Sequence, residues 1–107
     1  MNIFLLLMLS ALLTFSAEAT QYKTDSNIHY YPEHINKTKP YLNERGVLDV
    51  YCPISTKKVA TIVWFHGGGL TGGNKEIPEA LKEKAMCIVA VNYRLSPQVK
   101  SPTYIED

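Results

Sequence analysis

Two short apolar runs dominate the pattern of hydrophobic and polar positions in the second half of the chain. The first is Thr61–Phe65 and the second is Ile88–Val91, and beyond Thr61 neither contains a polar side chain. Uninterrupted runs of this length are typical of parallel strands that helices cover on both faces. We therefore expect two neighbouring parallel strands that are buried on both sides and joined by a right-handed crossover.

The residues before these runs predict an antiparallel edge to the same sheet. Ile28–Tyr31 and Val47–Tyr51 are rich in β-forming residues, and each is followed within two residues by a proline. We expect these two segments to pair with each other in an antiparallel meander. The composition of residues 20–26 indicates a loose polar leader, and that of residues 33–40 indicates a loop.

One helix is predicted between the two apolar runs, over Ile77–Ala85. Pro78 suits a first helical turn, and Ile77, Ala80 and Leu81 form an apolar stripe at helical spacing. The fold class that follows is α/β, with a mostly parallel sheet, an antiparallel edge meander and helices on both faces. Because one helix cannot cover two buried strands, we expect residues 20–107 to be the incomplete N-terminal segment of a single larger domain.

The amino terminus has the pattern of a signal peptide. The segment from Ile3 to Phe15 is almost entirely apolar but too short to span a bilayer, and Ala17-Glu18-Ala19 has the form of a cleavage site. We expect residues 1–19 to be removed after Ala19, which implies a secreted or periplasmic protein without stable membrane insertion. A buried helix and a membrane anchor are the alternatives for this segment.

Composition narrows the range of functions. A formal net charge of +1 gives no basic surface for nucleic acid, and we expect no nucleic-acid partner. No His or Cys pair has the spacing of metal ligands, so no metal is expected. Asn36-Lys37-Thr38 is an N-glycosylation sequon, which has meaning only in a eukaryotic protein.

The first apolar run ends on His66-Gly67-Gly68-Gly69, which opens a segment that we call the glycine loop (residues 66–75). Consecutive glycines remove side chains at the carboxyl end of a strand, so that backbone N–H groups can approach a ligand directly. This arrangement predicts an anion hole.

Two other glycine-rich motifs fit this segment less well. Gly67, Gly69 and Gly72 match the dinucleotide fingerprint G-x-G-x-x-G, but no helix opens directly after them and the next strand ends on Asn92 instead of an acid. A phosphate-binding P-loop requires Lys and then Ser or Thr after its last glycine, whereas Gly73 is followed by Asn, Lys and Glu.

The third motif is the HGGG oxyanion loop, and here the chain resembles the α/β-hydrolase family. The similarity is to esterases of the hormone-sensitive-lipase-like branch and to bacterial feruloyl and acetyl esterases. It rests on four blocks in order, Leu48–Tyr51, Trp64–Gly69, Gly72–Lys75, and Asn92–Pro97 with Tyr104–Asp107. The resemblance implies a serine-type hydrolase of carboxylic esters that needs no cofactor and acts on a small-molecule or carbohydrate ester.

The resemblance also implies roles for individual residues. The amides of Gly68 and Gly69 would donate to the oxyanion, Gly67 would permit the turn, and His66 would fix the loop through a ring hydrogen bond. Arg94 would pair with an acid under the site and brace the glycine loop. No serine stands in G-x-S-x-G, and Ser96 lacks the flanking glycines, so the nucleophile, acid and base are expected beyond residue 107 and the segment alone is expected to be inactive.

The resemblance leaves two questions open. A non-catalytic binding module built on the same fold is the alternative function, although such a module has no use for an oxyanion hole. In the resembled topology Cys52 and Cys87 lie on antiparallel neighbouring strands, so they form either a disulfide in an oxidising compartment or two buried thiols, with the thiols favoured.

Overall fold

The computed structural model describes residues 16–107. Most of the predicted signal peptide, residues 1–15, lies outside this range, and residues 16–19 are exposed and have no regular secondary structure. Among the described residues, no helix has the length and apolar character needed to cross a membrane.

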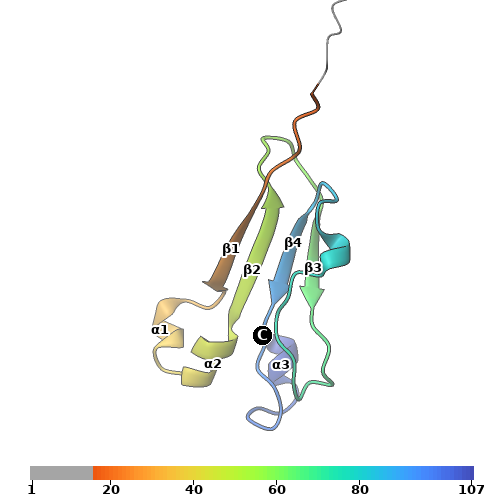
Figure 1. Cartoon of the computed structure of the whole chain (residues 1–107). Helices are drawn as coiled ribbons and strands as arrows, with labels where there is room; N and C mark the ends of the chain where they lie inside the picture. Colours follow the sequence, from red (N-terminus) through yellow and green to blue (C-terminus); the bar gives the residue numbers. More distant parts are fainter. Residues whose placement is uncertain (1–15) are drawn as a thin grey trace, which may run out of the picture.

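The structure is built on one mixed sheet of four strands (Figure 1). Its order is β1-β2-β4-β3, and the strand bounds are β1 Tyr22–His29, β2 Val47–Pro53, β3 Thr61–Phe65 and β4 Cys87–Val91. Strands β1 and β2 are antiparallel, β2 and β4 are antiparallel, and β3 and β4 are parallel. The predicted parallel pair and the predicted antiparallel edge are both confirmed, although the described sheet is mixed and not mostly parallel.

The helices are short and differ from the prediction. They are α1 Glu33–Asn36, α2 Pro40–Arg45 and α3 Thr103–Glu106, with one 3-10 turn, η1, at Glu79–Leu81. The loop predicted over residues 33–40 is therefore wrong except at residues 37–39, and the helix predicted over residues 77–85 is wrong as well. That helix stops because Lys82 is extended and because Glu83 and Ala85 both adopt positive φ, at 57° and 56°.

Strand β1 replaces the loose leader that composition predicts. It starts at Tyr22, six residues before the first predicted β segment, and it pairs with β2 along almost its whole length. Nearly all of its residues are exposed, so it carries no alternating apolar pattern from which a strand could be predicted. The ladder holds it to the sheet together with stacking of Tyr22 on Tyr51, whose ring centroids are 4.8 Å apart.

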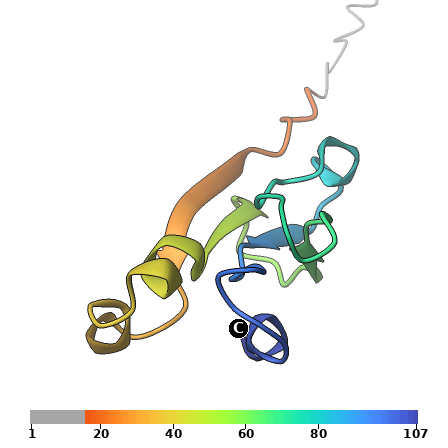
Figure 2. The ribbon, with the colours of Figure 1, turned by 90° about the horizontal axis from the view of Figure 1, so that it is seen from below.

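The two apolar runs have different environments. In β4, Ile88 and Ala90 have no exposed surface, as expected for a buried strand. In β3, by contrast, Val63 is 52% exposed and Phe65 is 63% exposed, so the expected burial of this strand on both faces is not found. The reason is its position, since β3 is the edge strand of the described sheet and the helices lie at the end of the sheet and not over its faces (Figures 1 and 2).

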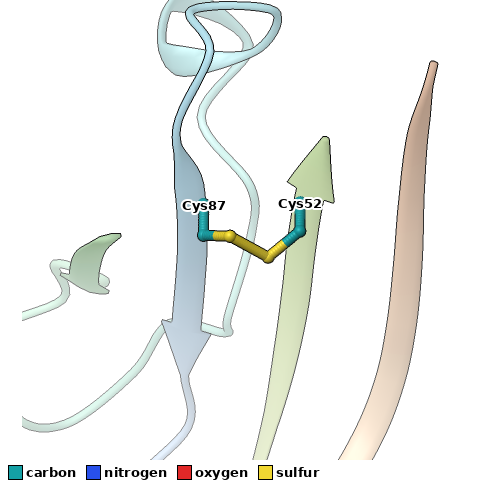
Figure 3. The surroundings of a disulfide bond; sticks show 2 residues. All are labelled: Cys52 and Cys87. Carbon is teal, nitrogen blue, oxygen red and sulfur yellow. A yellow bond between two sulfur atoms is a disulfide. The ribbon is translucent and has the colours of Figure 1, made fainter. Parts of the chain in front are cut away.

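Cys52 and Cys87 form a disulfide between β2 and β4 (Figure 3). The antiparallel register pairs Tyr51 with Ile88, so the two cysteines are the next residues directly opposite each other, and their Cα atoms are 4.2 Å apart. Their strands are antiparallel neighbours as expected, but the favoured alternative of two free thiols is wrong.

The sequon asparagine has a structural role. Asn36 is 5% exposed, and its Nδ2 donates to the carbonyl of Tyr31 at 2.9 Å. Because Nδ2 is the atom that would carry a glycan, the folded conformation leaves it neither accessible nor free of hydrogen bonds.

Candidate active site

Three segments that are distant in sequence meet at one end of the sheet. The glycine loop follows β3, residues 92–94 follow β4, and α2 ends immediately before β2 begins. Because β2 runs antiparallel to β3 and β4, its start lies beside their carboxyl ends, as Figure 1 shows. In open α/β sheets, ligands bind at the carboxyl ends of the strands, so the topology places the loop where a site is expected.

The glycine loop closes on itself through backbone contacts that only glycine permits. Gly68 and Gly73 have positive φ, at 132° and 102°. A Cβ at Gly68 would overlap the carbonyl oxygen of Gly72, and a Cβ at Gly73 would overlap the carbonyl of Gly67 and the ring of His66. A side chain at either position would therefore force the two halves of the loop apart.

Inside the loop, hydrogen bonds converge on one carbonyl. The carbonyl of Gly68 accepts from the amides of Thr71 and Gly72, both at 3.2 Å, and from the Thr71 hydroxyl at 3.1 Å. Gly69 and Leu70 follow it with φ of 62° each, and the carbonyl of Leu70 accepts from the amide of Ser96 at 2.8 Å. These contacts fix a tight turn in which successive residues have left-handed conformation.

Gly68 and Gly69 are the two residues whose amides the sequence assigns to the oxyanion hole. Both residues are exposed, and within residues 16–107 neither amide donates a hydrogen bond to a protein group. Gly67, the third glycine of the motif, has open space around it and a negative φ, so its own conformation does not require glycine. The two residues assigned to the oxyanion hole therefore present free donors, which is what an anion-binding turn requires.

His66 has both ring nitrogens engaged. Nδ1 lies 2.8 Å from the carbonyl of Gly67, and Nε2 lies 3.4 Å from an Nη2 donor of Arg45. A carbonyl can only accept and a guanidinium can only donate, so Nδ1 carries the proton and Nε2 the lone pair. His66 is 6% exposed, and its ring stacks on Tyr93, whose hydroxyl donates to the His66 carbonyl at 2.7 Å. The expected ring hydrogen bond is present, and neither nitrogen faces a substrate as a base would.

Arg45 is the residue of this site that sequence reasoning missed. Its Nε donates to the carbonyl of Tyr93 at 3.0 Å, and its Nη2 donates to the carbonyl of Gly73 at 3.1 Å. Its Nη1 donates to Asn74 Oδ1 at 3.3 Å, in addition to the contact with His66. The sequence analysis predicts no helix over residues 41–45. The position of Arg45 at the carboxyl end of α2 was therefore not predicted.

Arg94 pairs with an acid, as expected, but does not brace the glycine loop. Its Nη2 donates to Asp107 Oδ1 at 2.6 Å and its Nε to Oδ2 at 2.9 Å, while its backbone amide also donates to Oδ2. The Asp107 side chain is fully buried, and burial raises its pKa, but the hydrogen bonds from Arg94 outweigh burial and hold the pKa below its ordinary value. Arg94 therefore fixes α3 to the end of β4, and Arg45 takes the role expected of it.

Polar contacts join the four sequence blocks on which the resemblance rests, and the Tyr93 hydroxyl, which donates to the His66 carbonyl, brings in the block Trp64–Gly69. Asn92 Nδ2 donates to Asn74 Oδ1 at 2.7 Å, and Asn92 Oδ1 accepts from the amide of Lys75 at 2.6 Å. The Lys75 ammonium lies 2.8 Å from Asp49 Oδ1, and both side chains are largely buried. The blocks are thus connected by one hydrogen-bond network, which holds the end of the glycine loop, at Asn74 and Lys75, against β2 and β4.

A hollow of about 470 Å³ lies beside this network. It shares Tyr93 with the site, and its lining is mainly apolar, with Leu48, Phe65, Val91 and Ile105. Tyr30 also lines it, and its hydroxyl donates to the carbonyl of Asn92, while burial raises the pKa of that hydroxyl. Residues 16–107 contain no group of three His, Cys, Asp or Glu side chains arranged to hold a metal ion.

Comparison with known proteins adds two similarities. The family model described as BD-FAE matches residues 48–107, which is more than half of the chain and contains all four blocks. Glutactin of Drosophila melanogaster is 38% identical over 52 residues, which cover 47% of this chain. The aligned part is only 5% of glutactin, so this chain spans a small part of that relative.

Proposed function

This chain belongs to the BD-FAE family, an esterase-related family of α/β-hydrolases, and on that premise we propose that it supplies the oxyanion hole of a serine-type carboxylic ester hydrolase. The family relation supports the general class of reaction, which is ester hydrolysis. The observation that supports the specific role is that Gly68 and Gly69 are exposed and that neither amide has an acceptor within residues 16–107, in a turn that tolerates no side chain at Gly68.

The proposed chemistry is acyl transfer. A nucleophile attacks the ester carbonyl, whose oxygen becomes negatively charged in the tetrahedral intermediate, and the amides of Gly68 and Gly69 donate hydrogen bonds to that oxygen. The turn is fixed before substrate arrives, so the donors need no reorganisation when the charge develops. Loss of one such donor typically lowers kcat by about 10²-fold or more.

The catalytic triad is not part of the proposed role of this segment. The sequence contains no G-x-S-x-G, and His66 has both ring nitrogens engaged. In this fold the triad follows the oxyanion loop in the order serine, acid, histidine. We therefore assign the nucleophile, acid and base to residues beyond Asp107, so that residues 20–107 by themselves are inactive.

The proposed substrate is a small-molecule or carbohydrate ester, and the chemistry needs no cofactor. Attack by serine and relay of its proton by histidine involve no redox step. We also propose export to the periplasm or the cell exterior, with cleavage after Ala19. N-terminal sequencing of the exported protein should then find Thr20, whereas retention of Met1 on a cytosolic product would contradict this.

The sharpest test removes a single N–H from the loop. Proline at position 69 is unsuitable, because Gly69 has φ of 62° and proline requires about −65°. An amide-to-ester replacement at Gly69, in which glycolic acid takes the place of glycine, removes the donor and allows the same φ, while the Gly68 carbonyl that closes the turn becomes a weaker acceptor. In the complete natural protein it should lower kcat for ester hydrolysis by about 10²-fold while KM stays nearly constant.

The same replacement at Gly72 is the matched control. The Gly72 amide donates within the loop, to the carbonyl of Gly68, and is not assigned to the oxyanion. Its loss should therefore cost less in kcat than the loss at Gly69. Equal kcat for the Gly69 ester and the unmodified protein would exclude the oxyanion assignment.

A fluorophosphonate probe, which labels activated serines, separates the enzyme from the alternative of a binding module. The complete natural protein should be labelled, and residues 20–107 alone should not. Labelling of the segment alone would place a nucleophile within it, against our assignment. A complete protein that is neither labelled nor active on any ester would instead support a non-catalytic module.

A further inference from the structure

We propose that Arg45 is the positioning residue of the oxyanion loop, acting on Gly68 and Gly69 through the two ends of the glycine loop. This role deepens the proposed function and depends on it for the kinetic part of its test. Neither the sequence motif nor the family match assigns any role to Arg45, which lies before the matched residues 48–107.

The guanidinium contacts both ends of the loop at once. It reaches His66 at the start of the loop, at 3.4 Å, and Gly73 and Asn74 at its end, at 3.1 and 3.3 Å. On its other side Nε donates to the Tyr93 carbonyl at 3.0 Å, which fixes the plane of the guanidinium to the end of β4. One rigid planar group therefore sets the separation between the beginning and the end of the turn that carries the two amides.

The charge of Arg45 is also unlike that of the other cations at this end of the sheet. Lys75 is paired with Asp49 and Arg94 with Asp107. Within the described part of the chain, Arg45 has no carboxylate at salt-bridge distance, and its partners are carbonyls, an amide oxygen and an imidazole. A half-buried positive charge that contacts the loop and has no carboxylate partner among residues 16–107 favours an anion at the loop.

Lysine cannot reproduce this arrangement. Its ammonium is a compact point charge with no fork, so it cannot contact Tyr93, Gly73 and His66 from one plane. Arg45→Lys therefore keeps the charge and loses the geometry, while Arg45→Ala loses both. The pair of variants separates positioning from electrostatics.

The kinetic experiment compares these variants in the complete natural protein. We expect Arg45→Lys to lower kcat for ester hydrolysis by about 10-fold and Arg45→Ala by about 10²-fold, with KM nearly constant, because small misplacements of catalytic donors have effects of this size. Free guanidinium, well below denaturing concentrations, should restore part of the activity of Arg45→Ala but not of Arg45→Lys. Arg94→Lys is the matched control, and it should cost stability with a smaller change in kcat than Arg45→Lys.

Hydrogen exchange provides a readout that does not need activity. The amides of Thr71 and Gly72 donate to the Gly68 carbonyl, so their protection reports the closed turn. Arg45→Ala should accelerate their exchange while the amides of β4 remain protected. If the natural protein shows no esterase activity but this acceleration occurs, the proposed function fails and the positioning role stands. Unchanged exchange at Thr71 and Gly72, or full kcat in Arg45→Lys, would overturn the positioning role.

Discussion

The two ends of β4 are held by different means. At its start, Cys87 is bonded covalently to Cys52 of β2. At its other end, the next three residues in the chain hold the glycine loop and α3 through hydrogen bonds. Asn92 holds the end of the glycine loop, Tyr93 holds its beginning, and Arg94 holds α3 through Asp107.

This difference separates what maintains the sheet from what shapes the site. A disulfide fixes the spacing of two strands but has no donors to arrange around a ligand. The amide of Asn92, the hydroxyl of Tyr93 and the guanidinium of Arg94 follow one another in the chain and hold the loops at this end. Each of their hydrogen bonds depends on the orientation of donor and acceptor. The proposed chemistry lies at the polar end, so changes there should affect both stability and catalysis, whereas changes at the covalent end should affect stability alone.

The largest expected loss of stability comes from Arg94→Ala. The variant leaves the fully buried Asp107 carboxylate without its partner, and breaking a buried pair in this way costs about 3–5 kcal/mol. Urea unfolding of the complete natural protein measures the loss. The double variant Arg94→Ala/Asp107→Ala should recover part of it, since no buried charge then remains unpaired. A single variant as stable as the natural protein would mean that the pair is solvated in solution.

Removal of the disulfide should have the next largest effect. The cysteines are 35 residues apart in sequence, and a cross-link that closes a loop of this length contributes about 2–4 kcal/mol. The variant Cys52→Ala/Cys87→Ala should lower the free energy of unfolding by this amount. At temperatures where it remains folded, its kcat should be unchanged. A large fall in kcat would contradict the separation between the two ends of β4.

How far the sequence predicted each strand depended on the apolar pattern of its side chains. The run Ile88–Val91 gave a correct strand because its four side chains are all apolar, and three of the four residues are buried. Residues 22–27 of strand β1 were missed because an exposed edge strand is held by its backbone ladder, which leaves no trace in side-chain type. The helix expected over residues 77–85 had a suitable apolar stripe, but positive φ at Glu83 and Ala85 ended it, and neither residue type indicates such a conformation.

The candidate site shows the same limit in a sharper form. Gly68 and Gly69 could be proposed from sequence because a run of glycines has few uses other than close backbone approach. Arg45 could not, because its role arises from tertiary contacts with residues that lie between 21 and 48 positions away. The prediction for Arg94 was half right for the same reason. Its position after a buried strand indicated an acid partner, but nothing in the sequence indicated that Arg94 holds α3 and not the glycine loop.

A smaller effect is expected for Tyr93→Phe, which tests the beginning of the glycine loop. The variant keeps the ring that stacks on His66 but removes the hydroxyl that donates to the His66 carbonyl at 2.7 Å. Loss of one such buried hydrogen bond should cost about 1 kcal/mol in the free energy of unfolding. It should also lower kcat modestly, because the loop would lose one of its fixed points. Unchanged stability would show that the stacked ring alone holds His66.

The smallest expected effect is a dependence of stability on acid pH, which arises at Arg94 and not at Arg45. The folded pKa of Asp107 is held below its ordinary value by Arg94, so the pair stabilises the fold fully above the unfolded pKa of about 3.9. That stabilisation is lost as the pH falls from there through the lower folded pKa, because the folded state must then take up a proton that the unfolded state already binds. The loss should be smaller than in Arg94→Ala, since a protonated Asp107 still occupies its place and can still accept a hydrogen bond.

Asp107→Asn isolates this contribution, because it preserves the shape of the side chain and removes its titration. Urea unfolding between about pH 3 and pH 7 should show that the variant is less stable than the natural protein at neutral pH and loses less stability toward acid. Arg45→Lys should keep the acid dependence of the natural protein, since Arg45 has no carboxylate partner among residues 16–107. If Asp107→Asn and the natural protein lost stability in parallel toward acid, the acid sensitivity would belong to other carboxylates. The carboxylate partner of Arg94 would then not distinguish it from Arg45 in the pH dependence of stability.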